Sequence, residues 1–188
     1  MIPLRSDAIE VIRMRLRDII ASKSLLTGRQ FTLASGKPSS VFFDMKRTML
    51  DPEGSNLIAD LMLDTLAKED IDHVGGVAMG AVPLVSSICV KSYHRPLRLH
   101  YFYVRKEAKD HGTESLVDGE IKKGAKVAIL EDVTTTGGSA MKAVAAVKAQ
   151  GGQVKLVLTI IDRGEGAEAT FKAHGLRLIP LLTSSDFA

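Results

Sequence analysis

The sequence predicts an α/β fold in which a mainly parallel, twisted sheet is flanked by helices. Apolar, strand-like runs alternate along the chain with helical patterns of about ten to fifteen residues, as crossover connections require. The chain of 188 residues is the size of one domain. Polar, glycine-containing loops follow the apolar runs, and ligands of parallel sheets bind beyond the carboxyl ends of the strands. We therefore expect one domain with a binding site at that edge.

The first 45 residues predict a helix and a small irregular region. An amphipathic helix is expected to begin near Asp7, with Glu10 completing a capping box. Its buried face would consist of Ile9, Ile12, Leu16 and Ile19. Short strand-like pieces at 31–33 and 41–43 flank a polar turn at 35–38.

The rest of the chain predicts alternating strands and helices. Asp51 is expected to cap a helix that starts with Pro52, and Leu57, Ile58, Leu61 and Met62 would form its buried face. Strands are predicted at 73–78, 97–104, 127–130 and 154–161. Helices are predicted from about 83 to 91, from 138 to 150, and up to about residue 175. A largely polar stretch, 105–124, precedes the third of these strands.

Composition and charge exclude several classes of protein. Hydrophobic residues make up 45% and charged residues 25% of the chain, and the net charge of +3 is modest. No apolar run reaches the roughly 18 residues that cross a bilayer, and the N-terminus lacks the apolar core of a signal peptide. A single cysteine, Cys89, cannot form an internal disulfide, and its apolar helix predicts a buried position. We expect a cytoplasmic protein that binds neither membrane nor nucleic acid.

The segment 126–139 predicts a site for a phosphorylated sugar. An apolar run ends in Glu131 and Asp132, and a loop of small residues and a helix start follow. Glycines let the backbone approach a phosphate, and the helix start supplies free N–H groups. The carboxylates suit sugar hydroxyls or a metal ion, although an arbitrary acidic pair is more often simply solvated. The binding residues would be Glu131, Asp132, Val133, Thr134, Thr135, Thr136, Gly137, Gly138 and Ser139.

The basic stretch after residue 104 forms a second candidate group. Arg105, Lys106, Lys109 and His111 lie close enough in sequence to neutralise a leaving group such as pyrophosphate. A connection of this length in a compact domain often forms a mobile lid, here expected at 105–119. A solvated charged loop is the alternative, and the absence of interleaved aromatic residues argues against nucleic acid.

Two further features are compatible with a pocket for a flat ring and a clamp for a carboxylate. Phe42 and Phe43 could pack in the core or form the wall of a small pocket beside Lys46. Arg163 follows a strand and could form a surface ion pair or clamp a carboxylate, for which its planar fork is suited.

These segments resemble a known family. The segment 127–139 resembles the phosphoribosyl pyrophosphate-binding motif of type I phosphoribosyltransferases, and the stretch Arg-Lys-Glu-Ala-Lys-Asp-His-Gly looks like the catalytic loop of orotate phosphoribosyltransferases. The segments Phe-Thr-Leu-Ala-Ser-Gly-Lys and Phe-Phe-Asp, and the later Asp-Arg-Gly-Glu-Gly, also match that family. The resemblance extends over about residues 20–170.

The resemblance implies a fold, a reaction and a role for each residue. It implies a small N-terminal hood within 1–45 and an α/β core at 46–175. Glu131 and Asp132 would hold the ribose hydroxyls, and residues 134–139 the 5-phosphate. Pyrophosphate would be bound by Arg105, Lys106, Lys109 and His111, partly across a homodimer, and orotate by Phe42, Phe43, Thr135 and Arg163. Mg²⁺ would be the cofactor, held mainly by pyrophosphate oxygens rather than by protein ligands.

The chain departs from the family pattern at two lysine positions. Ala34 and Gly80 stand where many members have lysine, and Lys37, Lys46 or Lys91 could compensate. The departures leave open a phosphoribosyltransferase for another nucleobase, or a regulator that binds phosphoribosyl pyrophosphate without turnover.

Overall fold

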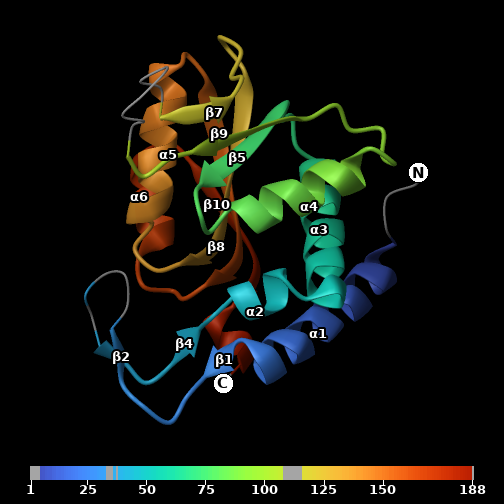
Figure 1. Ribbon diagram of the computed structural model, residues 1–188, viewed down its shortest axis with the longest axis vertical. Helices are drawn as coiled ribbons and strands as arrows, with labels where there is room; N and C mark the ends of the chain where they lie inside the picture. Colours follow the sequence, from blue (N-terminus) through green and yellow to red (C-terminus); the bar gives the residue numbers. More distant parts are fainter. Residues whose placement is uncertain (1–4, 33–35, 37, 108–115, 188) are drawn as a thin grey trace.

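A six-stranded sheet forms the centre of the molecule in the computed structural model, which describes residues 5–32, 36, 38–107 and 116–187 (Figure 1). Its strands are ordered β10-β9-β8-β5-β6-β7. Neighbouring strands are parallel except β6 and β7, which are antiparallel. The strands are β5 (His73–Val77), β6 (His100–Val104), β7 (Val117–Gly119), β8 (Lys126–Thr134), β9 (Gln153–Asp162) and β10 (Arg177–Thr183). The predicted α/β class and mainly parallel sheet are confirmed.

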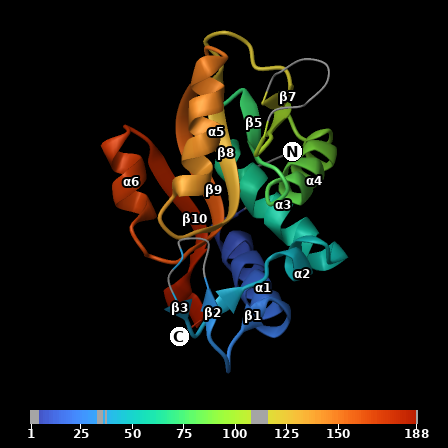
Figure 2. The ribbon, with the colours of Figure 1, turned by 60° about the vertical axis from the view of Figure 1, so that its left-hand side comes forward.

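Helices cover both faces of the sheet (Figure 2). Helices α1 (Ser6–Lys23), α3 (Pro52–Leu66) and α4 (Val82–Ser92) contribute to one core, and α5 (Gly138–Ala149) and α6 (Ala167–Ala173) contribute to the other. Strand β8 shows the division, because Ala128 and Leu130 belong to the first core while Val127 and Ile129 belong to the second. Side chains on a strand alternate between faces, so an unbroken apolar run serves both layers.

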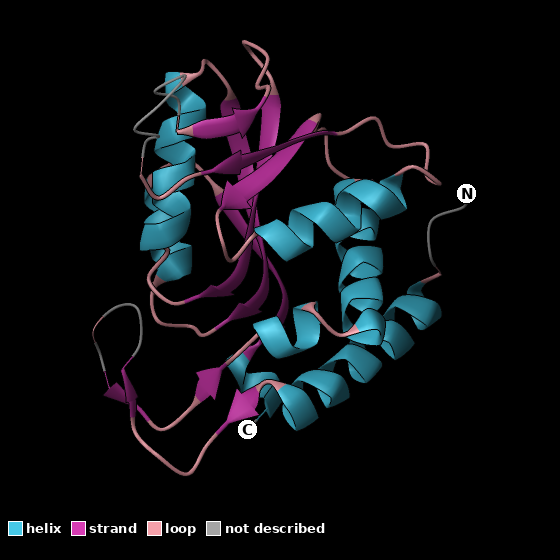
Figure 3. Ribbon diagram, in the orientation of Figure 1, coloured by secondary structure: helices cyan, strands magenta, loops and turns pink. Residues whose placement is uncertain are grey.

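Two small two-stranded sheets, formed by residues from the first quarter of the chain, lie beside the core close to the C-terminus (Figure 3). Strand β1 (Leu25–Leu26) pairs with β4 (Phe42–Phe43), and β2 (Phe31–Thr32) pairs with β3 (Pro38–Ser39), both antiparallel. A short helix, α2 (Lys46–Met49), leads from β4 to α3. We call residues 25–32 and 38–43 the hood. The C-terminal 3-10 helix η1 (Ser184–Phe187) packs against it, with the rings of Phe43 and Phe187 5.2 Å apart.

The positions of the predicted helices are confirmed, with two corrections of detail. Asp51 caps α3 as expected, because its Oδ1 accepts a hydrogen bond of 3.0 Å from the Gly54 N–H. The expected capping box at Asp7 is wrong: α1 begins one residue earlier, and its N-cap, Arg5, makes no side-chain cap bond. Asp7 instead lies in the first turn, where an acid suits the helix dipole. Cys89, expected in the core, is exposed.

Several strands differ from the sequence prediction: β6 begins at His100 rather than at 97, and the short strands β1 and β3 were not predicted. Strand β8 continues past Leu130 to Thr134, because parallel pairing with β9 persists as far as Thr134 and Asp162. Strands β7 and β10 were not predicted, since β7 is only three residues long and β10 contains Pro180, a residue that disfavours a strand within a sheet. Within the described residues no helix has the length and apolar character that crossing a membrane requires.

Candidate functional site

A cavity of about 580 Å³ opens where β8 ends and α5 begins. Parallel strands present their carboxyl ends at one edge, and the cavity joins the loops that follow them to the hood. Its lining residues are Phe42, Phe43, Asp44, Met45, Lys46, Lys106, Glu131, Asp132, Val133, Thr134, Thr135, Thr136, Gly137, Gly138, Ser139, Ala140, Lys142 and Arg163. The acidic pair, the small-residue loop, the start of the basic stretch and Arg163 therefore meet at one place.

Burial opposes the charge of both carboxyl groups in the acidic pair. Burial, and then the neighbouring charge of Asp132, raise the pKa of Glu131 to about 8, against a hydrogen bond from Ser139. One oxygen of Glu131, Oε2, is buried without a hydrogen-bond partner. Burial also raises the pKa of Asp132, although the Val133 N–H donates to its Oδ1 at 2.9 Å and Lys46 favours the charged form. Glu131 Oε2 therefore lacks a donor, and a hydroxyl group of a ligand would supply one.

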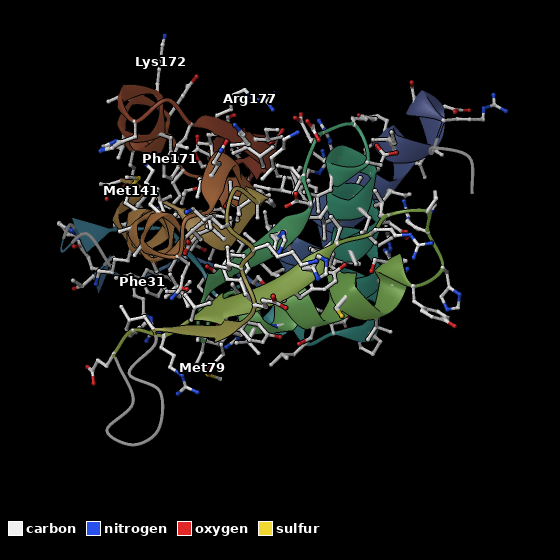
Figure 4. All side chains as sticks on the ribbon, turned by 90° about the horizontal axis from the view of Figure 1, so that it is seen from above. Phe31, Met79, Met141, Phe171, Lys172 and Arg177 are labelled. Atoms are coloured by element: carbon white, nitrogen blue, oxygen red, sulfur yellow. The ribbon has the colours of Figure 1, made fainter. Side chains whose placement is uncertain are left out.

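The loop between β8 and α5 is suited to an anion. It is shorter than expected, because Glu131 to Thr134 belong to the strand. Gly137 has φ +85°, and a Cβ on it would lie 2.8 Å from the ring of Phe171, which sits between α6 and α5 (Figure 4). Only glycine fits such a position. No side chain caps α5, which leaves the N–H groups of its first turn available to a ligand, and Gly138, Ser139 and Ala140 of that turn line the cavity.

The rest of the loop is fixed to its surroundings by backbone hydrogen bonds. The Arg163 N–H donates to the Thr134 carbonyl at 3.0 Å, and the Ala167 N–H donates to the Thr135 carbonyl at 3.1 Å. The loop is therefore held against the turn that follows β9. Rigid placement of this kind allows binding energy to be used without a further ordering cost.

The basic stretch is only partly placed. Lys106 lines the cavity, whereas Arg105 does not and is paired with Asp118 of β7 at 2.6 Å. Lys109 and His111 lie outside the described residues. Two further lysines line the cavity, Lys46 and Lys142. Lys142 was missed from sequence, although it lies one helical turn after Gly138 and so shares its side of α5.

Arg163 joins the turn after β9 to the hood. Its Nε donates to Glu165 Oε1 at 2.7 Å, its Nη1 to the Val41 carbonyl at 3.0 Å and its Nη2 to Ser39 Oγ at 3.0 Å. The guanidinium carbon lies 5.8 Å from the centre of the Phe43 ring. Phe43 is buried and Phe42 half-buried, and both line the cavity, so core packing and pocket wall are compatible here.

Lys46 is the described lysine best placed to compensate for the departures at Ala34 and Gly80. Lys91 is engaged elsewhere, in an ion pair of 2.6 Å with Asp60. Ala34 and Lys37 lie outside the described residues. A Cβ on Gly80 would lie 3.4 Å from Asp132 Oδ1, so a side chain at residue 80 would border the acidic pair that Lys46 already influences.

The described residues offer no ready-made metal cage. Among them no group of three or more His, Cys, Asp or Glu side chains is placed to hold an ion. Magnesium in phosphate-transfer sites is commonly bound by one or two carboxylates together with substrate phosphates. The acidic pair, with its unpartnered Glu131 oxygen, fits such partial ligation.

Comparisons with known proteins agree with this geometry. The phosphoribosyl transferase domain family matches residues 48–175. The chain is 49% identical to an orotate phosphoribosyltransferase of Rhodopseudomonas palustris over 93% of its length and 95% of that protein. It superposes on the Mycobacterium tuberculosis orotate phosphoribosyltransferase in complex with Fe(III) dicitrate with a TM-score of 0.80 and 37% identity, covering 94% of this chain and 99% of that one. A structure of the same enzyme in complex with 5-phospho-alpha-D-ribosyl 1-diphosphate gives a TM-score of 0.77 and 33% identity, covering 94% and 98%.

Proposed function

The chain belongs to the orotate phosphoribosyltransferases within the phosphoribosyl transferase family, and from that premise we propose how its residues carry out the reaction. Enzymes of this family transfer the 5-phosphoribosyl group from phosphoribosyl pyrophosphate to orotate in pyrimidine synthesis, giving orotidine 5-phosphate and pyrophosphate. The observation that carries the assignment of roles is the single cavity that brings an acidic pair, an anion-binding loop and Arg163 together.

The sugar donor occupies the side of the cavity formed by β8 and α5. Glu131 and Asp132 accept hydrogen bonds from the ribose hydroxyls, which satisfies the unpartnered Glu131 oxygen. The 5-phosphate is bound by residues 134–139, through backbone N–H groups at the start of α5 and through hydroxyl groups. Val133 completes the wall of this half of the site.

Orotate occupies the side of the cavity formed by the hood. Phe42 and Phe43 contact the flat ring, and Thr135 lies at the junction of the two halves. Arg163 binds the carboxylate, since three of its five N–H donors are used by the protein and two remain. A planar guanidinium and a planar carboxylate match in geometry.

The reaction needs no nucleophile from the protein. The ring nitrogen of orotate attacks the anomeric carbon and loses its proton. The carbon–oxygen bond to pyrophosphate breaks, the electron pair leaves with pyrophosphate, and the departing pyrophosphate can accept the proton. Catalysis then consists of positioning, exclusion of water and stabilisation of the leaving group by Lys106, Lys109, His111 and Arg105. Mg²⁺, held mainly by pyrophosphate oxygens beside the acidic pair, would supply further neutralising charge. Arg105 would have to exchange its contact with Asp118 for the leaving group.

An absorbance assay tests the function directly. Purified protein with orotate, phosphoribosyl pyrophosphate and Mg²⁺ should deplete the orotate absorbance, and no depletion at high protein concentration would refute the proposal. A panel of uracil and purine bases separates the alternative substrates. A regulator would instead bind phosphoribosyl pyrophosphate without turnover. It would also retard DNA in a mobility-shift assay, and added salt would weaken this binding.

We also propose a homodimer in which the basic stretch completes the partner's site. The exposed apolar side chains of Met79, Val90 and Tyr93, on and beside α4, support it.

The organisation and location of the chain are two further proposals. We propose that the chain divides into an N-terminal part, 1–45, and a core, 46–175. We also propose a cytoplasmic location, because the single cysteine cannot form the internal disulfide that an oxidising compartment would allow. Fractionation of cells that express the protein tests this location.

A further inference from the structure

The guanidinium of Arg163 is oriented by three protein acceptors, one at each of its three nitrogens. Glu165 accepts from Nε, the Val41 carbonyl accepts from Nη1, and Ser39 Oγ accepts from Nη2. The side chain is only 9% exposed, yet it lines the cavity. Its two remaining N–H donors are on the terminal nitrogens, so the direction in which they point depends on these three contacts.

Glu165 is the charged member of this set, and the backbone places it there. It lies in the turn between β9 and α6, where the Gly164 N–H donates to Asp162 Oδ1 at 3.1 Å. Gly164 and Gly166 both have positive φ, 69° and 106°, which returns the chain so that Glu165 lies beside Arg163. The Glu165 side chain is 24% exposed, so its interaction with the arginine is partly shielded from water.

We propose that Glu165 is a positioning residue that makes the site selective for an acidic base. By accepting a hydrogen bond from Nε, it fixes the orientation of the planar guanidinium, so that the two remaining N–H donors of the terminal nitrogens stay directed at the carboxylate of the substrate. Bidentate binding of a carboxylate requires this alignment, whereas a neutral base gains nothing from it. The inference rests on the proposed function, because it concerns recognition of orotate by Arg163.

Substitution of Glu165 tests the inference with orotate and with uracil, which lacks the carboxylate. Glu165→Ala should raise the KM for orotate about tenfold, the effect of one charge-assisted hydrogen bond. The inhibition constant of uracil and the KM for phosphoribosyl pyrophosphate should change less than about twofold. Glu165→Gln keeps a carbonyl acceptor for Nε and should recover most of the lost affinity. Glu168→Ala, which removes an exposed carboxylate from the first turn of α6, is the matched control and should resemble the wild type.

Each other outcome refutes the inference. Equal losses for orotate and uracil, or a raised KM for phosphoribosyl pyrophosphate with a lower Tm, would show that Glu165 only supports the fold. A lower KM for orotate in Glu165→Ala would show that Glu165 competes with the substrate. If the wild type does not consume orotate, the proposed function fails and the inference with it. If the wild type is active and Glu165→Ala keeps its KM for orotate, only the inference fails. Ser39→Ala releases the opposite edge of Arg163 and should also raise the orotate KM, which keeps the test open if Glu165→Ala does not fold.

Discussion

Glu131 carries the clearest pH dependence in the structure. Its pKa is raised from 4.5 to about 8, so the folded protein keeps a proton that the unfolded chain releases above its ordinary pKa. The contribution of Glu131 to stability is therefore complete below about pH 4.5 and is lost as the pH rises through about 8. We expect Glu131→Gln to remove this loss and to stabilise the free protein by about 2 kcal/mol at high pH.

Urea unfolding of wild type and Glu131→Gln over a range of pH measures the effect. Glu120→Gln, which changes an exposed carboxylate on the chain segment before β8, is the control and should leave the pH dependence of unfolding unchanged. Parallel pH profiles for the wild type and Glu131→Gln would contradict the assignment of a buried, proton-holding carboxyl.

Lys46 provides the second prediction at the scale of single residues. It lines the cavity and favours the charged form of Asp132, the side chain that a residue at position 80 would border. We expect Lys46→Met to raise the KM for phosphoribosyl pyrophosphate about fivefold, through loss of one favourable charge.

Steady-state kinetics with a matched control tests this role of Lys46. Lys155→Met makes the same charge change near the start of β9, outside the lining of the cavity, where Lys155 Nζ donates to Gln153 Oε1 at 3.1 Å. The Lys155→Met variant should leave kcat and the KM for phosphoribosyl pyrophosphate unchanged. An unaltered KM in Lys46→Met would show that Lys46 does not replace the lysine that is absent at position 80.

At the scale of elements, the turn into α5 makes the sharpest steric demand. A side chain at Gly137 would combine a positive φ with a contact of 2.8 Å to Phe171, whereas Gly164 has a similar φ and nothing within 4 Å of a Cβ. We expect Gly137→Ala to destabilise the fold by about 3 kcal/mol and Gly164→Ala by about 1 kcal/mol.

Chemical unfolding of the two variants separates strain from overpacking. Relief of the contact between the new Cβ and Phe171 would displace the start of α5. We therefore also expect Gly137→Ala to bind phosphoribosyl pyrophosphate more weakly, which isothermal calorimetry measures. Equal losses of stability in the two variants would show that Phe171 moves aside without cost.

The sequence predicted those elements whose local signals agree with their packing. Asp51 and Pro52 mark the start of α3, and an apolar run marks β8, in agreement with the structure. Strand β7 could not be predicted, because its three residues acquire strand geometry only by pairing with β6. The end of β8 was placed too early, because polar residues after Leu130 continue the strand through pairing with β9. Tertiary pairing, rather than propensity, determines such boundaries.

The candidate site was predictable to the extent that chain topology determines it. Loops after parallel strands must share an edge, so Glu131, Lys106 and Arg163 could be grouped from sequence. The hydrogen bonds of Arg163 to Ser39 and Val41 could not, because they join positions more than a hundred residues apart. No local pattern reports a contact at such separation.

At the scale of the whole molecule, the proposed homodimer predicts complementation between inactive variants. Lys109→Ala damages the basic stretch and Asp132→Asn damages the sugar site. If one subunit supplies the basic stretch to its partner, mixed dimers contain one site with both defects and one with neither. We expect subunit exchange to restore about a quarter of wild-type activity, since about half of the dimers are mixed and each has one intact site.

Activity and molar mass should be measured on the same mixtures. Light scattering must show a dimer, and each variant alone must remain inactive after the same exchange treatment. Mixed dimers that stay inactive would place the basic stretch in the site of its own subunit.

Arg163 connects the turn after β9 to the hood, and this connection limits how the substrate specificity of the protein can change in evolution. Arg163 is the proposed contact for the acidic substrate, and it also holds residues 39 and 41 of the hood through two hydrogen bonds. A descendant that exchanged Arg163 to accept a neutral base would lose both hydrogen bonds in the same step, which would leave the hood to its remaining contacts, such as that between Phe43 and Phe187. A change of specificity is therefore coupled to the stability of the hood, and a compensating contact for the hood would favour it.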